Sequence, residues 1–193
     1  MREFIYFSQA AKTSGNFNTN ELMKAGRMDI AIHVVIASLF LSHDVREDVK
    51  LHLIFYGQPT PPRHIEIQAQ KGLDISKKDV AGLIKRILYK YREGKRTEVF
   101  PGCWIEKKNF FEVIEQLREH GKEIFLLDKS GENIRKAKIG KNCVFILGDH
   151  NGLPKKELKR LKKIAKPVSV GNRVYFASHI VAIVNNELDM RGI

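Results

Sequence analysis

The stretch Phe145-Ile146-Leu147-Gly148-Asp149-His150-Asn151-Gly152-Leu153 runs from an apolar segment directly into a loop that contains two glycines. Residues 142–147 are apolar on both faces, which is typical of a central strand in a parallel sheet. Residues 148–152 form the loop, and Pro154 opens a predicted helix over residues 154–165. Because ligands of open α/β sheets gather at the carboxyl ends of the strands, this loop is a candidate binding segment.

The regions on either side continue the alternation of strands and helices. Hydrophobic patterning predicts strands over residues 2–8, 49–57, 63–70, 122–128 and 167–170, and helices over 28–41, 109–120 and 177–188. Ser76 and Asp79 have the spacing of a capping box before another helix, which carries the apolar positions of residues 80–91. Residues 59–62 predict a hairpin turn, 93–104 a loop and 128–131 a turn. The pattern favours one α/β domain over residues 1–193, with a largely parallel sheet flanked by helices.

The composition narrows the class of protein. The chain has 193 residues, with 34 Lys and Arg against 22 Asp and Glu, and so a formal charge of +12. A polyanion is the expected partner, with nucleic acid first and an anionic membrane surface as the alternative. Two cysteines are too few for a disulfide framework or a four-thiolate metal site. Without an apolar run of about 18 residues or a segment of signal-peptide type, we expect a soluble, cytoplasmic protein.

Two stretches of the chain are strongly basic. Residues 77–96 form one, and the predicted helix after residue 153 forms the other, with Lys155, Lys156, Lys159, Arg160, Lys162, Lys163 and Lys166. Contacts of these side chains with phosphates would give affinity and salt dependence without sequence choice. A solvated helix face explains the same residues, so both interpretations stay open.

Several common catalytic motifs are missing from the sequence. No Gly-x-Gly-x-x-Gly follows a predicted strand, there is no P-loop, and no pair of His or Cys has zinc-ligand spacing. We expect His150 and His179 to lie on the surface and Cys103 to be a small buried thiol. Three loops at strand ends remain as candidates, over residues 127–128, 147–150 and 170–175. Glycines in two of them would let the backbone approach a ligand closely, although ordinary turns also use glycine there.

Short motifs along the chain occur together in one known family. Residues 145–153 are followed by a basic helix, by Ser169-Val170-Gly171 and by an apolar helix that contains Val184-Asn185-Asn186-Glu187-Leu188-Asp189. The N-terminal half contains Met1-Arg2-Glu3-Phe4-Ile5, Gly26-Arg27-Met28-Asp29, Leu41-Ser42-His43-Asp44-Val45-Arg46 and Phe100-Pro101-Gly102. Together these segments resemble the SPOUT methyltransferases and, among them, the archaeal tRNA (pseudouridine(54)-N(1))-methyltransferase family. The resemblance covers essentially the whole chain.

This resemblance implies a fold, a cofactor and an assembly. SPOUT proteins pass the C-terminal segment, here about residues 122–193, through a loop into a trefoil knot, which general topology rules would not predict. The loops of the knot bind S-adenosyl-L-methionine, and the family acts as a homodimer. By position, the cofactor contacts would be Leu127, Gly148, Gly171, Asn172, Arg173, Val174, Tyr175, Phe176 and Ile180. The family usually has Cys at the last position, where an apolar Ile can still line an adenine pocket.

The implied reaction is methylation of N1 of pseudouridine 54 in the T-arm of tRNA. Pseudouridine is joined to its sugar through carbon, so N1 keeps a proton that must leave, or whose charge must be delocalised, as the methyl group arrives. Asp29 and Asp44 are candidates for contacting that proton, and Arg27 and Arg46 for stabilising charge on a carbonyl oxygen. Helix capping and ion pairing explain the same four residues. No metal is expected to take part.

Two other functions stay open. A related SPOUT enzyme of the Nep1 family would use the same cofactor site to methylate pseudouridine in ribosomal RNA. A non-enzymatic RNA-binding module or assembly factor with a degenerate knot is the second alternative. Ile180 favours this module, whereas Gly148 and Gly171 argue against it.

Overall fold

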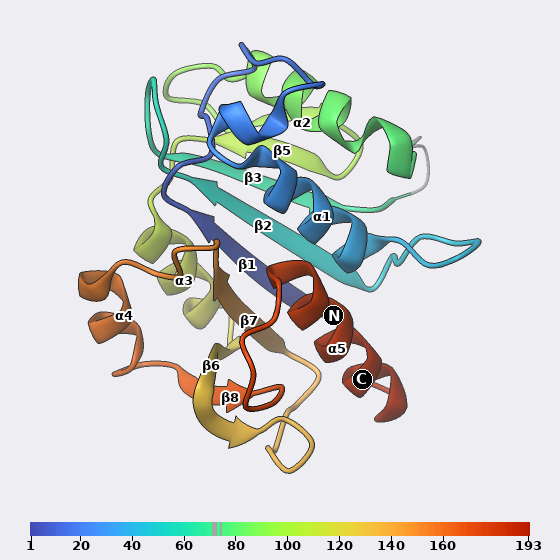
Figure 1. The fold of residues 1–193 in the computed structure, drawn as a ribbon, viewed down its shortest axis with the longest axis vertical. Coiled ribbons are helices and arrows are strands. Elements are labelled where there is room, and N and C mark those ends of the chain that lie inside the picture. The colour runs from blue at the N-terminus through green and yellow to red at the C-terminus, as the bar shows by residue number, and fades with distance from the viewer. Residues whose placement is uncertain (71–72, 74) are drawn as a thin grey trace.

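One sheet of eight strands, in the order β4-β5-β3-β2-β1-β7-β6-β8, runs through the molecule (Figure 1). The structure is a computed structural model that describes residues 1–70, 73 and 75–193. The strands are β1 (Arg2–Ser8), β2 (Val49–Phe55), β3 (Arg63–Gln68), β4 (Thr97–Phe100), β5 (Cys103–Glu106), β6 (Glu123–Asn133), β7 (Cys143–Gly148) and β8 (Lys166–Ser169). Five neighbouring strands, in the order β2, β1, β7, β6 and β8, pair in parallel. The other three, β3, β5 and β4, add an antiparallel extension next to β2.

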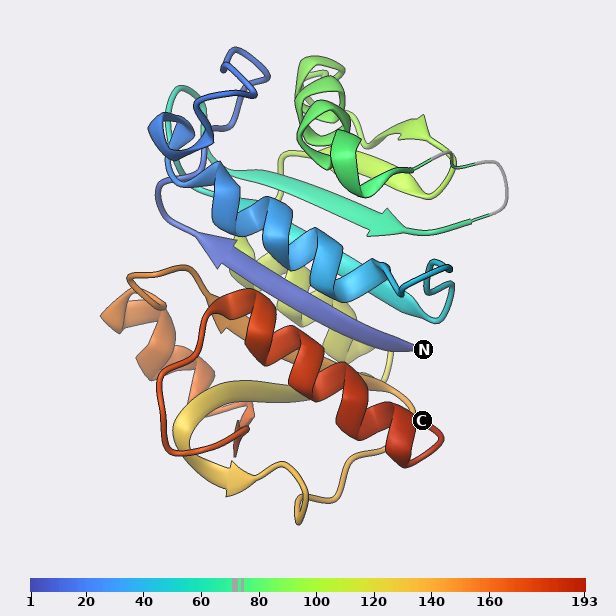
Figure 2. The same ribbon diagram turned by 45° about the vertical axis from the view of Figure 1, so that its right-hand side comes forward.

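Helices cover both faces of this sheet. Helices α1 (Met28–Leu39), α2 (Val80–Tyr89) and α5 (Ala177–Met190) lie on one face, and α3 (Phe110–Glu119) and α4 (Lys155–Leu161) lie on the other (Figure 2). Two short 3₁₀ helices precede α1 and α2, over Leu22–Ala25 and Lys77–Asp79. The α/β fold with a mostly parallel sheet flanked by helices is therefore confirmed.

β1 lies at the centre because its side chains are apolar on both faces. Phe4, Ile5, Tyr6 and Phe7 are at most 2% exposed. Phe4 and Tyr6 pack in the core beneath α1 and α5, whereas Ile5 and Phe7 pack beneath α3. β1 pairs in parallel with β2 on one side and with β7 on the other. β7 is equally buried, which confirms the prediction of a central parallel strand at residues 142–147.

The segment predicted as a loop over residues 93–104 contains β4 and the first two residues of β5. Each strand has only four residues, and the turn between them holds Pro101 and Gly102, whose φ is +74°. Such short strands carry too little alternation to stand out against the Gly and Pro around them. Pairing of β5 with β3 supplies the hydrogen bonds that fix this hairpin.

The turn predicted over residues 128–131 lies inside β6 instead. The register of β6 against β8 shifts between Leu127 and Glu132, so these residues bend the strand without reversing it. Gly131 is required there, because a Cβ would lie 2.5 Å from the backbone carbon of Pro167. Turn residues in the sequence thus mark a bulge.

The capping box predicted at Ser76 and Asp79 is only half present. The Ser76 hydroxyl accepts from the backbone N–H of Lys78, but the Asp79 carboxylate accepts from the side chain of Arg86, further along α2. The capping box that does form starts α3, where Asn109 and Glu112 exchange hydrogen bonds with each other's backbone.

The two ends of the chain lie close together, at the start of β1. Arg2 at the start of β1 is 4% exposed and donates to Asp189 at 2.8 Å and to the carbonyl of Asn185 at 3.0 Å, both on α5. α5 lies beside α1 on the sheet (Figure 2). None of the helices in the described ranges is long and apolar enough to cross a membrane.

Candidate functional site

A cavity of about 760 Å³ lies at the bulge of β6 and at the carboxyl ends of β7 and β8. Its walls are the three late segments that the sequence singled out, around residues 126–129, 147–153 and 168–177, with Ile30 of α1 beside them. Pockets of roughly 300–1,000 Å³ are the usual size for small-molecule and cofactor sites. The position at the carboxyl ends of parallel strands agrees with the general rule for α/β sheets.

The structure brings nearly all of the predicted cofactor residues to this cavity. Among the described residues its lining includes Leu127, Gly148, Gly171, Arg173, Val174, Tyr175, Phe176 and Ile180, but not Asn172. Their role toward a cofactor stays a prediction, and their common location is a structural finding.

Gly148 allows the loop after β7 to fold back tightly. A Cβ at this position would lie 2.5 Å from the backbone carbon of Gly152, so even alanine would disturb the loop. Asp149 fastens the same loop to the end of β1: its carboxylate accepts from the Ser8 hydroxyl at 2.9 Å and from the Gln9 N–H at 3.1 Å. The glycine therefore shapes the cavity wall through the loop's own backbone.

The loop after β8 forms the opposite wall and presents apolar groups to solvent. Gly171 has φ +153°, a backbone conformation that other residues rarely adopt, and Ser169 bonds both to its N–H and to its carbonyl. Val174 is 87% exposed and Phe176 is 76% exposed, although both line the cavity. The cavity thus has an apolar, open rim on this side.

Other lining residues extend the site beyond the predicted cofactor contacts, among them Asp128 and Ile30. Asp128 follows directly on Leu127, and its carboxylate accepts from the N–H and hydroxyl of Ser130 and pairs with Lys162 at 3.2 Å. These hydrogen bonds, first of all that from the Ser130 backbone, lower the pKa of Asp128. The sequence had already singled out residues 127–128 as a candidate segment, and the structure places Asp128 at the bulge of β6. Ile30 reaches the cavity from α1, far away in sequence, and no local pattern indicates it.

Arg27 and Asp29 form a fork-shaped ion pair at the N-terminal end of α1. The Nε and one Nη of Arg27 each lie 3.0 Å from an oxygen of Asp29, and the Arg27 hydrogen bond lowers the pKa of that carboxyl. Arg27 has φ +60°, which is uncommon for a residue with a side chain and is often found at functional sites. Ile30, one residue beyond the pair, lines the cavity.

Tyr6 lies close to this pair and to the cavity loop. Its buried hydroxyl makes no hydrogen bond within the part of the chain that the structure describes. Burial raises the pKa of Tyr6, and the negative charges of Asp149 and Asp29 raise it further. The hydroxyl therefore stays protonated, with a hydrogen to donate between the cavity loop and α1.

Asp44 and Arg46 lie at the other end of α1. The helix has 12 residues, so its two ends are about 18 Å apart. Arg46 forms a two-pronged ion pair with Asp189 of α5, and Asp44 accepts from the N–H of Val45 at 2.7 Å. Within one chain, the four predicted catalytic residues therefore lie at the two ends of α1, and only Arg27 and Asp29 lie near Ile30, which lines the cavity.

The basic helix α4 begins beside the cavity, which Leu153 and Leu158 line. Part of its charge has a structural role, since Lys162 pairs with Asp128 and the Arg160 guanidinium stacks 3.6 Å over the Phe111 ring. Four exposed lysines on and just after α4 have no ion pair among the described residues: Lys155, Lys156, Lys159 and Lys163. These four could contact a phosphate backbone next to the cavity.

Comparison with known proteins gives consistent relatives. A family model of SAM-dependent RNA methyltransferases matches residues 1–193. A tRNA (pseudouridine(54)-N(1))-methyltransferase of Methanocella arvoryzae is 38% identical over 197 residues, covering 99% of this chain and 100% of that protein. The protein of the same name from Methanococcoides burtonii is 34% identical and covers 98% of this chain and 96% of its own length.

A solved structure shares the fold. The crystal structure of Archaeoglobus fulgidus Nep1 bound to S-adenosylhomocysteine superimposes with a TM-score of 0.63, covering 99% of each chain at 14% identity. At that identity the likeness concerns the fold alone, whereas the family model and the relatives concern the whole sequence. The chain belongs to the family of S-adenosylmethionine-dependent RNA methyltransferases.

Proposed function

We propose that this protein transfers the methyl group of S-adenosyl-L-methionine to N1 of pseudouridine 54 in the T-loop of tRNA. The observation that carries this proposal is similarity along the full length. Relatives named for this reaction are 32–38% identical over at least 98% of the chain. Their names give the tRNA position, and the cavity gives a place where the cofactor can bind.

The residues around the cavity suit S-adenosyl-L-methionine. Leu127 and Ile180 offer apolar surface for an adenine ring, and the backbones of the loops at Gly148 and Gly171 can supply polar contacts. The Asp128 carboxylate, kept ionised by Ser130 and Lys162, suits a hydroxyl or ammonium group. When bound, the cofactor supplies an electrophilic methyl group on a sulfonium.

Arg27 and Asp29 are the residues we propose for the acceptor base. Since its pKa is lowered, Asp29 is a hydrogen-bond acceptor that can hold the N1–H group without keeping the proton for long. The Arg27 guanidinium can stabilise negative charge on a neighbouring carbonyl oxygen of the base. Asp29 would hold the N1–H group in place while N1 receives the methyl group of the bound cofactor, and the N1 proton would then pass to solvent.

The knot, the single domain and the homodimer belong to the same proposal. Around the C-terminal helix, Arg191 donates to the carbonyl of Ala137 at 2.8 Å, and the N–H of Ile134 bonds to the carbonyl of Ser169 at 2.8 Å. These contacts support a C-terminal segment that passes through the loop after β6. The exposed apolar side chains of Val174 and Phe176 support a second copy over the open side of the cavity. Action in the cytoplasm follows from the proposed tRNA substrate.

Nucleoside mass spectrometry with isotopically labelled cofactor tests the function. Three RNAs are compared: a tRNA T-arm with uridine at position 54, the same arm with pseudouridine, and a ribosomal RNA hairpin with pseudouridine. We expect N1-methylpseudouridine only from the second RNA, because the N1 of uridine is bonded to the sugar. Extruded bases in RNA loops are accessible to such sites, so an isolated arm suffices.

Each of the other outcomes indicates a different function. Labelling of the uridine arm indicates methylation of another atom, such as a ribose hydroxyl or guanine. Labelling of the ribosomal hairpin alone indicates a Nep1-like enzyme. A protein that methylates none of these RNAs, and whose melting temperature does not respond to saturating cofactor, is the RNA-binding module.

A further inference from the structure

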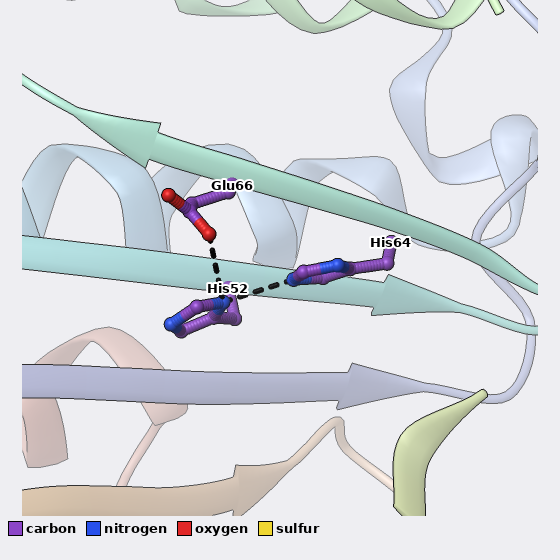
Figure 3. A group of neighbouring side chains, drawn as sticks. All are labelled: His52, His64 and Glu66. Atoms are coloured by element: carbon purple, nitrogen blue, oxygen red, sulfur yellow. Dashed lines mark hydrogen bonds and ion pairs between the residues drawn. The ribbon is translucent and has the colours of Figure 1, made fainter. Parts of the chain in front are cut away.

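A second group of polar side chains is buried in the other half of the sheet. His52 of β2 and His64 and Glu66 of β3 point toward one another across the two strands (Figure 3). The two histidines are 3% and 4% exposed. His52 Nδ1 lies 2.9 Å from His64 Nε2 and 3.9 Å from Glu66 Oε2. None of the three residues lines the cavity at the other end of the sheet.

The ring nitrogen of each imidazole that faces away from the other histidine lies close to a carboxylate. His52 Nε2 lies 2.9 Å from Glu3 on β1, and His64 Nδ1 lies 3.0 Å from Glu106 on β5. Lysines fix these carboxylates in turn, since Lys122 lies 2.6 Å from Glu3 and Lys108 lies 3.1 Å from Glu106. The outer side of the cluster is therefore a fully paired network that spans four strands.

With both histidines neutral, the inner side of the cluster holds no hydrogen. An ionised carboxylate can only accept, so the outer nitrogen of each histidine must carry the hydrogen. In two neutral imidazoles, both inner nitrogens then carry lone pairs, and these face each other at 2.9 Å with the Glu66 oxygen beside them. Three electron-rich atoms converge on one small gap, an arrangement that a cation in that gap would stabilise.

We propose that His52, His64 and Glu66 bind one divalent transition-metal ion, with zinc as the best match. Two imidazoles and a carboxylate are a recognised zinc ligand set, with a water left for the fourth position. Histidine ligands of metals almost always donate their other N–H to a carboxylate or carbonyl, which is the arrangement of Glu3 and Glu106.

The distances require only small movements. Ligands about 2.0–2.1 Å from a tetrahedral zinc lie roughly 3.3 Å from one another. Two of the observed separations, 2.9 Å and 3.9 Å, lie on either side of that value, and all three ligand atoms lie within 4.8 Å of one another. Glu66 Oε1 can keep its pair with Lys50 at 3.0 Å while Oε2 turns from Arg96, now at 3.3 Å, toward the ion. The ion would join β2 to β3 and, through Glu3 and Glu106, to β1 and β5.

Metal content and thermal stability of the full chain test this site. The protein is stripped with EDTA, dialysed, titrated with Zn²⁺, and its bound metal is measured by mass spectrometry. We expect one zinc per chain, a melting temperature higher by about 5 °C or more at saturation, and, with Co²⁺, the visible absorption of a tetrahedral site. His64→Gln and Glu66→Gln should retain about a tenth of the metal or less under the same conditions.

His43→Gln is the matched control, because His43 is exposed and lies outside the cluster. Glu66→Gln serves where His64→Gln fails to fold, since its amide oxygen can still accept from Lys50. Absence of tight zinc binding by the wild type would overturn the proposal. Equal loss from His43→Gln would overturn it too, as would an N–H···N bond between His52 and His64 in nitrogen-15 spectra that zinc leaves unchanged. Cofactor binding should be the same with and without zinc, so this test is independent of the proposed methyl transfer.

Discussion

At the scale of single residues, Arg27 combines an unusual backbone with a defined side-chain role. Its φ of +60° turns the chain from Gly26 into α1, and its guanidinium is locked onto Asp29. Neither side chain lines the cavity, although Ile30 next to them does. Acceptor-base and cofactor functions should therefore be separable by mutation.

Arg27→Asn and Ile180→Trp should affect different steps, the first turnover and the second cofactor binding. Asparagine tolerates the left-handed backbone, so Arg27→Asn removes the guanidinium without distorting the helix start. We expect its turnover to fall about 100-fold or more while the dissociation constant of the cofactor changes by less than about threefold. Ile180→Trp fills the cavity and should weaken cofactor binding at least about tenfold. Single-turnover methylation and calorimetric titration measure the two quantities.

Met190→Trp, on the exposed end of the same helix as Ile180, controls for an added indole ring. A folded Arg27→Asn protein that no longer binds cofactor would show that the two ends of the site act as one unit, contrary to our assignment.

At the scale of elements, α4 carries basic side chains that pack against the protein and others that are exposed without an ion pair among the described residues. Lys162 holds Asp128 at the cavity and Arg160 covers Phe111, so neutralising either one would change packing as well as charge. Lys155, Lys159 and Lys163 are four residues apart and exposed. They are therefore the better set for testing contact with RNA.

The triple variant Lys155→Gln, Lys159→Gln, Lys163→Gln should weaken tRNA binding and flatten its salt dependence. For every phosphate that the variant no longer neutralises, the slope of log K against log salt should become shallower by about 0.7–0.9. Binding measured by filter retention between about 50 and 200 mM salt tests this. The triple variant Lys77→Gln, Lys78→Gln, Lys90→Gln removes equal charge near α2. If both triples weaken binding equally, the two basic stretches contribute alike and α4 does not stand out as the RNA contact.

The sequence predicts those elements whose signal is local. β1, β7 and α3 follow from their apolar patterns, and the three cavity segments follow from the rule that ligands of α/β sheets gather at the carboxyl ends of the strands. β4 and β5 escape prediction because four residues are too few for a period to show. The bulge of β6 looks like a turn in the sequence because Asp128, Ser130 and Gly131 are residue types that occur in both.

The parts of the sites that depend on long-range pairing could not be predicted in this way. Ile30 reaches the cavity only because α1 packs over β1. The sequence gives no reason to prefer the start of α1, with Arg27, over its end, with Arg46, as the place of the acceptor base, and the length of the helix keeps the two apart. His52 and His64 have no zinc-ligand spacing along the chain. Only the register of the hairpin, in which His52 pairs with Glu66, brings them together.

At the scale of the whole molecule, one carboxylate holds three segments together. Asp189 on α5 pairs with Arg46 after α1 and with Arg2 at the start of β1. The two guanidinium groups, first of all that of Arg46, lower the pKa of Asp189 below its ordinary value. The stabilisation therefore depends on the ionised carboxylate.

Stability should decrease in acid through this carboxylate. Its folded pKa is lower than its unfolded one, so the contribution is complete above about pH 4 and is lost as the pH falls through the folded pKa. Because Asp189 is 38% exposed, we expect no more than about 1 kcal/mol from it. Urea unfolding between pH 7 and pH 3 of Asp189→Asn should show a weaker pH dependence than the wild type. Glu115→Gln, which changes an exposed carboxylate without an ion pair among the described residues, should behave as the wild type does.

The central place of β1 also bears on how the protein is made. A ribosome produces β1 first, yet β1 pairs with β7, more than a hundred residues later, and the Arg2 side chain also binds residues 185–193 at the end of the chain. During translation one side of this very apolar strand stays without its neighbour until nearly the whole chain has emerged. The nascent chain thus carries an open, aggregation-prone edge for most of its synthesis, and its final closure has to follow the last residues out of the exit tunnel.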